Sequence, residues 1–403
     1  MTATLPALSA LRPNPLWLEL PLFDRKGWKR VRFGDVVENC NETCEPAEAG
    51  LERFVAMEHL EPGSLHVRSW GNVADGTTFT RRCQPGQVLF GKRRAYQRKV
   101  AVSEFEAVVS GDIYVLAPKD TQRLLPELLP FLCLSERFFQ HAVGTSAGSL
   151  SPRTNWSSLA SFEFDLPPLD QQRRIAEILW AVDDSIQGST MLAASLRFVA
   201  EAKMRENVWN PNIKRFDFGE YVEIIDPNPS HRYPASVKDG VPLLATSDFE
   251  GENGFSYDSC QRVPRVVYEG QLARCRFTST DVVFARKGVI GLARPYGGQP
   301  KCFSHTIAMM KPRENRITPE FLLELVRSEG FLSEISRTMN SNSGVPTLGL
   351  QTIAAIKVPI PKLDAQRQID RDLGQLQTAR FAANAAIQGT NGVLTTFLST
   401  IIS

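Results

Sequence analysis

The sequence has few of the residues from which active sites are usually built. Its five histidines, at positions 59, 66, 141, 231 and 305, are scattered over 403 residues and show no metal-ligand spacing. It contains no Gly-x-x-x-x-Gly-Lys-Ser/Thr, Gly-x-Gly-x-x-Gly or Gly-x-Ser-x-Gly motif, so we do not expect ATP to bind through such a loop. We therefore interpret the chain as a binding protein, and we assign it no catalytic, cofactor-binding or metal-binding residue.

Cysteines and long apolar runs are also scarce. Of seven cysteines, only Cys40 and Cys44 lie close together, and no second pair completes a zinc site. No apolar run approaches the roughly 20 residues of a membrane span. The first ten residues lack the cationic start of a signal peptide. These absences predict free thiols in a reducing compartment and a soluble, cytoplasmic protein.

Two stretches, 76–103 and 282–313, contain no acidic residue but many basic ones. The net charge of the whole chain is only +2, so the positive charge is concentrated locally. Such a distribution indicates contact with the phosphate backbone of nucleic acid, although a solvated cationic face is the alternative interpretation. The candidate DNA-binding residues in these stretches and in nearby loops are Arg81, Arg82, Lys92, Arg93, Arg94, Arg98, Lys99, Ser149, Arg153, Arg274, Arg276, Arg286, Lys287, Arg294, Lys301, His305, Asn340, Asn342 and Ser343.

Most of the chain consists of two tandem copies of one unit. A shift of 194 positions places Leu166–Ile175 on Ile360–Ile369, and it also pairs Phe90 with Phe284. The openings of the two copies, which begin at Val31 and at Phe216, stand only 216 − 31 = 185 positions apart. The second copy therefore carries 194 − 185 = 9 additional residues, which we place around 240–259.

Each copy is predicted to be an α+β domain followed by a long helix. Short β-type runs such as 87–90 and 281–284 alternate with Gly and Pro, and helical stretches occur near 126–143 and 319–338. The predicted boundaries are 1–27 for an N-terminal extension, 28–166 and 210–360 for the two globular domains, and 167–209 and 361–403 for the two helices.

The two helices carry apolar residues at alternating steps of four and three, which is the spacing of a coiled coil. Asp170 and Asp364 suit the helix starts, where a carboxylate meets unpaired N–H groups. About 38 residues make a helix of ~57 Å, which exceeds a domain of this size. We therefore expect the two helices to pack as an antiparallel coiled coil with pseudo-two-fold symmetry. The alternative is that each is an amphipathic helix lying on its own domain. The predicted seam residues are Ile175, Leu179, Val182, Ile186, Leu196, Ile369, Leu373, Leu376, Ile387, Leu394, Phe397 and Ile401.

The segment Leu166–Leu179 resembles the start of the conserved helix in specificity (S) subunits of Type I restriction-modification enzymes. Asp281–Gly288 and Ser343–Pro346 resemble parts of the target recognition domains of that family, and the resemblance covers about residues 28–403. The sequence differs from the usual pattern of that family in two places. Gln171–Gln172 and Ala365–Gln366 stand where Glu-Gln is usual, and Gly91–Arg94 replaces a small residue, Arg and Gly.

The resemblance implies a non-catalytic DNA-recognition subunit that acts in DNA methylation and phage defence. Each target recognition domain would read one half of a split, asymmetric DNA site, with the half-site centres roughly one helical turn (~10 bp) apart. The helices would set this gap and hold two methyltransferase (M) subunits, which restriction (R) subunits would join. S-adenosylmethionine, ATP and magnesium would be bound by these partner subunits. Two other hypotheses are the recognition subunit of a related system with a fused methyltransferase-nuclease partner, and a duplicated scaffold that never binds DNA.

Side-chain chemistry suggests a division of roles among the candidate residues. Arginine and asparagine can hydrogen-bond a base edge with two groups at once, whereas lysine acts on phosphates as a point charge. The predicted base-reading residues are Arg93, Arg94, Arg286, Arg294, Asn340 and Asn342, and the predicted phosphate contacts are Lys92, Lys99, Lys287 and Lys301.

Overall fold

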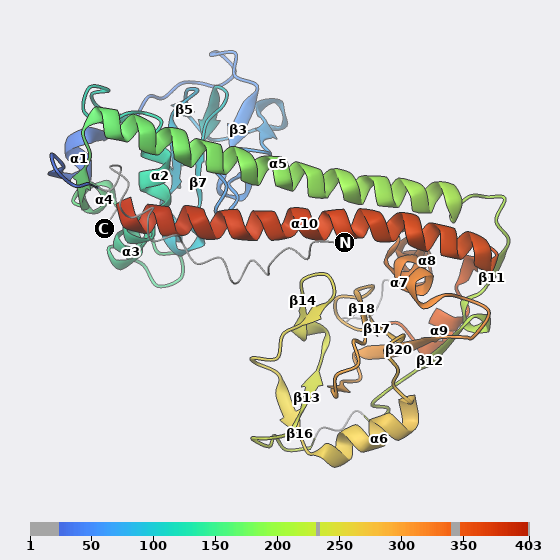
Figure 1. Cartoon of the computed structure of the whole chain (residues 1–403). Helices are drawn as coiled ribbons and strands as arrows, with labels where there is room; N and C mark the ends of the chain where they lie inside the picture. Colours follow the sequence, from blue (N-terminus) through green and yellow to red (C-terminus); the bar gives the residue numbers. More distant parts are fainter. Residues whose placement is uncertain (1–23, 231–233, 340–346, 402–403) are drawn as a thin grey trace, which may run out of the picture. The chain divides into compact units, whose positions relative to one another are not determined.

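The computed structural model describes residues 24–230, 234–339 and 347–401 (Figure 1). The chain divides into two units, one comprising Met1–Thr190 with Ala383–Ser403 and the other Met191–Ala382. Each unit contains one globular domain and a segment of each of the two long helices, α5 (Leu169–Asn207) and α10 (Leu363–Ile401). The predicted tandem α+β duplication is thereby confirmed.

The globular domain of the first unit contains two four-stranded sheets, and its first and last strands form a separate two-stranded sheet. The first sheet has the order β2-β9-β6-β7, the second has the order β4-β3-β8-β5, and β1 pairs with β10. The strands are β1 (Lys29–Arg32), β2 (Val37–Asn39), β3 (Arg53–Val55), β4 (Gly71–Asn72), β5 (Arg81–Cys83), β6 (Val88–Gly91), β7 (Val100–Val102), β8 (Ala107–Val109), β9 (Ile113–Pro118) and β10 (Glu163–Leu166). The helices are α1 (Phe33–Val36), α2 (Leu129–Leu134), α3 (Glu136–Gly144) and α4 (Trp156–Ala160).

The globular domain of the second unit repeats this plan with a smaller second sheet. The main sheet has the order β12-β20-β17-β18, the second has the order β16-β13-β19, and β11 pairs with β21. The strands are β11 (Arg215–Asp217), β12 (Val222–Ile225), β13 (Val241–Leu244), β14 (Phe249–Glu250), β15 (Gly254–Phe255), β16 (Gln261–Val263), β17 (Val282–Ala285), β18 (Ala293–Pro295), β19 (Cys302–Phe303), β20 (Ile307–Pro312) and β21 (Lys357–Pro359). The helices are α6 (Arg265–Cys275), α7 (Pro319–Arg327), α8 (Glu329–Thr338) and α9 (Leu350–Ala354).

The central strands β6 and β17 are buried on both faces, which explains their uninterrupted apolar sequences. Successive side chains of a strand point to opposite faces. Val88 and Phe90 therefore enter the core beneath α2 and α3, while Leu89 enters the core between the two sheets. Phe284 and Val283 are divided in the same way in the second domain.

Each predicted helical stretch is in fact two short helices that meet at a serine. Ser135 separates α2 from α3, and Ser328 separates α7 from α8, both with extended backbone (ψ 147° and 148°). The hydroxyl of each serine accepts a hydrogen bond from the backbone N–H three residues later, at 3.3 Å and 3.4 Å. The serines therefore act as N-caps that start a new helix in a new direction.

The additional residues of the second domain do not lie in the single place that we predicted. Strand β3 pairs with β8 through Phe54 and Val108, and β13 pairs with β19 through Leu243 and Cys302. The offset is 302 − 108 = 194 at β8 and β19 but only 243 − 54 = 189 at β3 and β13. Since 189 − 185 = 4 and 194 − 189 = 5, about four residues enter before β13 and five between β13 and β17.

Both long helices are 39 residues long, and each unit holds an antiparallel pair of helix segments. In the first unit, Ile175 and Leu179 near the start of α5 share a core with Leu394 and Ile401 near the end of α10. In the second unit, Met204 and Val208 near the end of α5 share a core with Ile369 and Leu373 near the start of α10. Among the described residues, no helix combines the length and apolar character needed to span a bilayer.

The predicted seam residues are all buried or half-buried. Ile175, Leu179, Ile369, Leu373, Leu394 and Ile401 are less than 9% exposed, and Val182, Ile186, Leu196, Leu376, Ile387 and Phe397 are partly buried. Sequence spacing alone did not identify Leu398, which is 5% exposed, or Met204, which is 3% exposed. These residues complete the helix packing in the first and second unit, respectively.

Candidate nucleic-acid interface

The two domains build the same loop framework around the end of their central strands. In the first domain the backbone N–H of Lys92 donates to the carbonyl of Asp112 at 2.9 Å, and Lys92 in turn accepts from Thr154 at 3.1 Å. In the second domain the backbone N–H of Arg286 donates to the carbonyl of Thr306 at 2.9 Å, and the carbonyl of Arg286 accepts from the backbone N–H of Leu348 at 2.8 Å. The matching positions are 194 residues apart, so three loops converge in each domain in the same way.

In the first domain this framework brings two arginines onto one carboxylate. Arg93 Nη1 lies 3.2 Å from Asp112 Oδ2, and Arg153 Nε lies 2.8 Å from Asp112 Oδ1. Arg93 Nη2 also donates to the Ser151 hydroxyl at 3.0 Å. The arginine side chains remain 40% and 53% exposed, whereas the Asp112 side chain is 18% exposed. The cluster is a cationic surface with a carboxylate at its centre.

The electrostatics of this cluster keep the Asp112 carboxylate charged. Burial alone raises the pKa of Asp112, but the hydrogen bonds and charges of Arg153 and Arg93 outweigh burial, so the pKa lies below its ordinary value. Lys92 lies beside the cluster with its ammonium 4.8 Å from the centre of the Tyr114 ring. Burial, and then the charge of Arg81, lower the pKa of Lys92.

Two arginines next to the cluster have left-handed backbone conformations that non-glycine residues rarely adopt. Arg94 and Arg98 have φ of 52° and 57°, and they flank the one-turn segment Ala95–Gln97. Backbone conformations of this kind concentrate at ligand-binding sites. Tyr96, at the centre of the turn, is 56% exposed.

Four other candidates of the first domain are engaged within the protein. Arg82 bridges Glu42 and Glu106 at 3.0 Å and 2.9 Å. The remaining three donate as follows: Arg81 to the Ile113 carbonyl, Arg98 to Glu136, and Lys99 to the Met57 carbonyl. These contacts use part of the hydrogen-bonding capacity that the sequence interpretation had assigned to DNA. Ser149 is exposed, in the loop that carries Ser151 and Arg153.

In the second domain, Lys287 and His305 lie together at the matching surface. Lys287 Nζ is 3.4 Å from His305 Nε2, and the Lys287 carbonyl accepts from the Thr246 hydroxyl at 3.4 Å. The Thr306 hydroxyl accepts from the backbone N–H of Thr246 at 3.3 Å. The second domain therefore presents lysine, histidine and threonine where the first presents two arginines and an aspartate.

Three predicted contacts of the second domain have side chains that lie in the protein interior, which argues against their binding DNA in this conformation. Arg286 is 8% exposed and pairs with Asp226 at 2.7 Å. Arg294 is 8% exposed and donates to the carbonyls of Ala293 and Gly251. Neither side chain is available to read a base edge.

Lys301 is the third of these buried residues. It is 2% exposed, and its ammonium donates to the Tyr296 carbonyl at 2.6 Å. Burial lowers the pKa of Lys301 to about 8. A phosphate cannot reach this ammonium without opening the domain.

The remaining candidates lie elsewhere on the second domain or outside the described residues. Arg274 donates to the Asp226 carbonyl at 2.7 Å, and Arg276, 68% exposed, pairs with Glu223 at 3.1 Å. Asn340, Asn342 and Ser343 lie outside the described residues.

Sequence reasoning missed Asp112, on which the cationic cluster of the first domain is organised. It lies outside the acid-free stretch, so it carried no signal of its own. A comparison of position 112 with position 306 would have indicated it, because aspartate in one copy is matched by threonine in the other. Among the described residues, no three His, Cys, Asp or Glu side chains gather as a metal site.

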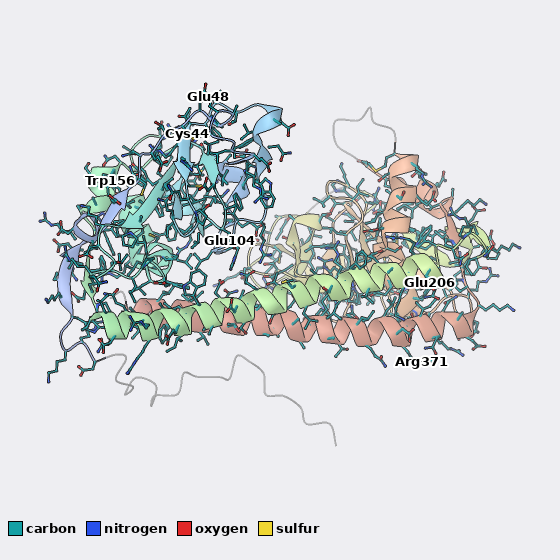
Figure 2. All side chains as sticks on the ribbon, turned by 90° about the horizontal axis from the view of Figure 1, so that it is seen from above. Cys44, Glu48, Glu104, Trp156, Glu206 and Arg371 are labelled. Atoms are coloured by element: carbon teal, nitrogen blue, oxygen red, sulfur yellow. The ribbon has the colours of Figure 1, made fainter. Side chains whose placement is uncertain are left out.

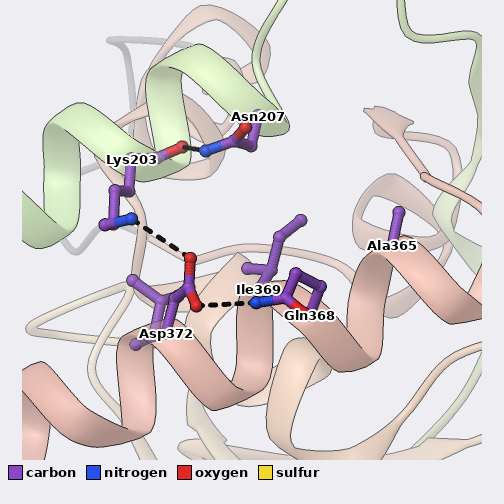
Figure 3. Close-up of a pocket in the computed structure, with 7 residues that line it drawn as sticks. Lys203, Asn207, Ala365, Gln368, Ile369 and Asp372 are labelled. Atoms are coloured by element: carbon purple, nitrogen blue, oxygen red, sulfur yellow. Dashed lines mark hydrogen bonds and ion pairs between the residues drawn. The ribbon is translucent and has the colours of Figure 1, made fainter.

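A small pocket lies in the second unit between the end of α5 and the start of α10 (Figure 3). Lys203 Nζ bonds Asp372 Oδ2 at 3.1 Å, and Gln368 Nε2 bonds Asp372 Oδ1 at 2.8 Å, so the polar groups already satisfy one another. Nearby, Glu206 of α5 and Arg371 of α10 are exposed on the helix surfaces (Figure 2). The Lys203–Asp372 ion pair therefore links the two helix segments of this unit across the pocket.

Comparison with known families identifies the same domain in both copies. A family model described as "Type I restriction modification DNA specificity domain" matches residues 25–192 and 245–388. The Type I restriction enzyme EcoDI specificity subunit of Escherichia coli is 26% identical over 182 residues, which are 42% of this chain and 38% of that relative. The chain thus spans well under half of that relative's length. The Type I restriction enzyme MjaVIII specificity subunit of Methanocaldococcus jannaschii is 21% identical over 376 residues, 84% of each chain.

Two solved structures have a similar fold. The Type-I restriction-modification system S subunit from M. genitalium has a TM-score of 0.56 and 13% identity, and the match covers 94% of this chain and 96% of that one. A chain from a structure described as the basis of complex assembly and conformational transition of the type I R-M system has a TM-score of 0.50 and 18% identity, with 93% and 97% coverage. At these identities the similarity concerns the fold alone.

Proposed function

Because this chain belongs to the family of Type I restriction-modification DNA specificity domains, we propose that it is the DNA-recognition subunit of a Type I restriction-modification complex. Each globular domain reads one half of a split, asymmetric site in double-stranded DNA. The two domains share a backbone framework but differ in the side chains that they present, so the two half-sites have different sequences.

One observation carries this proposal. Three converging loops form the same backbone hydrogen bonds in both domains, yet they hold Arg93, Asp112 and Arg153 in one and Lys287, Thr306 and Thr347 in the other. Base edges in the major groove differ in their pattern of donors and acceptors, so a constant framework with variable side chains suits the reading of two unlike sequences. A scaffold that binds only protein has no need of cationic loops at both matched positions.

The long helices support a second role, the docking of methyltransferase (M) subunits. Met191, Leu192, Phe198 and Val199 lie close together along α5 in the second unit and are 64%, 51%, 71% and 41% exposed. A cluster of exposed apolar side chains of this kind marks a protein-protein interface. We propose two M subunits per chain, one for each repeat, with restriction (R) subunits joining the complex.

The chemistry belongs to the partners in this proposal. The chain itself recognises DNA and is not an enzyme, while its partners bind S-adenosylmethionine, ATP and magnesium. The family match favours separate M and R subunits over a fused methyltransferase-nuclease partner, and the genes adjacent to this one discriminate between these two arrangements.

Duplex binding at several salt concentrations tests the DNA-binding role. The chain, purified with its M subunits, should bind DNA with an affinity that falls steeply between 50 mM and 200 mM salt, because each neutralised phosphate releases counterions. A scaffold that does not contact DNA would show no salt-dependent duplex affinity. That result would overturn the proposal.

A further inference from the structure

The side chain of Arg153 is held by one edge, which leaves its other nitrogens available. Its Nε donates to Asp112 Oδ1 at 2.8 Å, and the side chain is 53% exposed. No described residue accepts a hydrogen bond from its two terminal nitrogens. Arg93 holds the other oxygen of the same carboxylate at 3.2 Å and is itself held by Ser151 at 3.0 Å. The Asp112 carboxylate therefore orients the Arg153 guanidinium, and Arg93, which Ser151 holds, in turn orients that carboxylate.

This arrangement suits a base edge better than a phosphate. Guanine offers two acceptors, O6 and N7, in the major groove, and an oriented guanidinium can donate to both at once. A phosphate contact depends mainly on charge, and a carboxylate 2.8 Å from the arginine would repel the phosphate. Asp112 thus weakens any role of Arg153 as a simple cation and strengthens a role that requires fixed geometry.

The matching position in the second domain cannot make the same contact. The residues 194 positions after Asp112 and Arg153 are Thr306 and Thr347, on the same backbone framework. A threonine hydroxyl lacks the two-donor fork of a guanidinium. A guanine read in this way is therefore expected in the half-site of the first domain and not at the equivalent place in the second.

We propose that Arg153 is a specificity-determining residue that reads a guanine in the half-site of the first domain, and that Asp112 is the residue that positions it. This inference rests on the proposed function. Arg93 acts through its contact with Asp112, and its hydrogen bond to Ser151 attaches it to the loop that carries Arg153.

The test is a map of methylated sites in a host that carries the full complex. The variants are R153K, which keeps the charge but loses the fork, and D112N, which keeps the shape but loses the charge. Arg30 provides a matched control, since it is 50% exposed and pairs with Asp165 at 3.3 Å in the same domain. With R153K, methylation should no longer require G·C at one position of one half-site. The discrimination against other base pairs at that position should fall roughly tenfold to hundredfold. D112N should relax the same pair, and R30K should leave the motif unchanged.

The outcomes separate this inference from the proposed function. If R153K lowers methylation at all sites alike and relaxes no base pair, Arg153 contacts a phosphate and the inference is wrong, while the DNA-binding role stands. A half-site that relaxes with R153K but not with D112N would remove the positioning role of Asp112. If the unaltered complex shows no sequence-specific methylation at all, the proposed function itself fails. Co-purification of each variant with its M subunits shows that it has folded.

Discussion

Gln172 and Gln366, which stand 366 − 172 = 194 positions apart, form the same set of hydrogen bonds at the start of the two long helices. Each side-chain oxygen accepts from one backbone N–H, and each side-chain nitrogen donates to two backbone carbonyls. The partners are Leu125, Arg123 and Pro167 for Gln172, and Thr318, Arg316 and Pro361 for Gln366. Each glutamine thereby fastens the first turn of its helix to its own domain.

Replacing either glutamine by leucine should destabilise the protein. Gln172 is 1% exposed and Gln366 is 0% exposed. Each bonds one buried and two partly buried backbone groups, and leucine would leave the buried carbonyl unpaired, at a cost of about 1–3 kcal/mol. Thermal unfolding of Q172L and Q366L in the complex measures this loss. Q140L is the control, since Gln140 is exposed and its side chain bonds Glu136 at 3.1 Å on the protein surface. Equal melting temperatures for all three variants would contradict the role that we assign to the glutamines.

R286A should act on stability and not on base preference. Removing one partner of the buried Arg286–Asp226 pair leaves a buried charge uncompensated, which typically costs about 3–5 kcal/mol. The double variant R286M/D226L removes both charges and should recover part of the lost melting temperature. A stable R286A protein that methylates a relaxed motif would instead support the original assignment of Arg286 to base reading.

Substitutions of Lys287 and Lys301 should have different effects in a salt titration of DNA binding. Both substitutions, K287A and K301M, remove one positive charge from the same stretch of the second domain. Lys287 lies at the surface site and Lys301 is 2% exposed. K287A should weaken binding to all duplexes and reduce the slope of log affinity against log salt by about one, while K301M should leave the slope unchanged. A reduced slope with K301M would show that the domain opens on DNA.

The contribution of His66 to stability should depend on pH. Its Nδ1 lies 2.7 Å from Glu104, which is labelled in Figure 2, and its Nε2 lies 2.7 Å from Asp183 of α5. Burial lowers the pKa of His66, but the two carboxylates outweigh burial and the pKa is raised above its ordinary value of 6.5. The charged form is therefore favoured in the folded protein, and its stabilisation is complete below about pH 6.5 and lost as pH rises through the raised pKa.

Thermal unfolding of the unaltered protein and of H66Q at pH 6 and pH 9 tests this dependence. The difference in melting temperature between the two proteins should be larger at pH 6. A difference of equal size at both pH values would mean that His66 contributes only through packing and neutral hydrogen bonds.

The repeat and the helix seam could be predicted from sequence because both are periodic, and periodicity survives the substitution of individual residues. The charged residues were harder to place. The stretch 282–313 contains no acidic residue. The counter-charge for the buried Arg286 is instead Asp226, which lies 60 positions earlier in the sequence. The role of Asp112 could not be predicted either, because it depends on contact with Arg153, which lies 41 positions later in the sequence. A local count of charges does not reveal partners that only the fold brings together.

Sequencing that maps methylated bases, in a host with the complete complex and in the same host without this chain, tests the central claim most directly. We predict that methylation in the presence of this chain follows one motif of two short, unlike halves separated by a fixed gap of unspecified bases. One continuous or palindromic motif, or methylation that does not depend on this chain, would contradict the claim that its two domains each read half of the site.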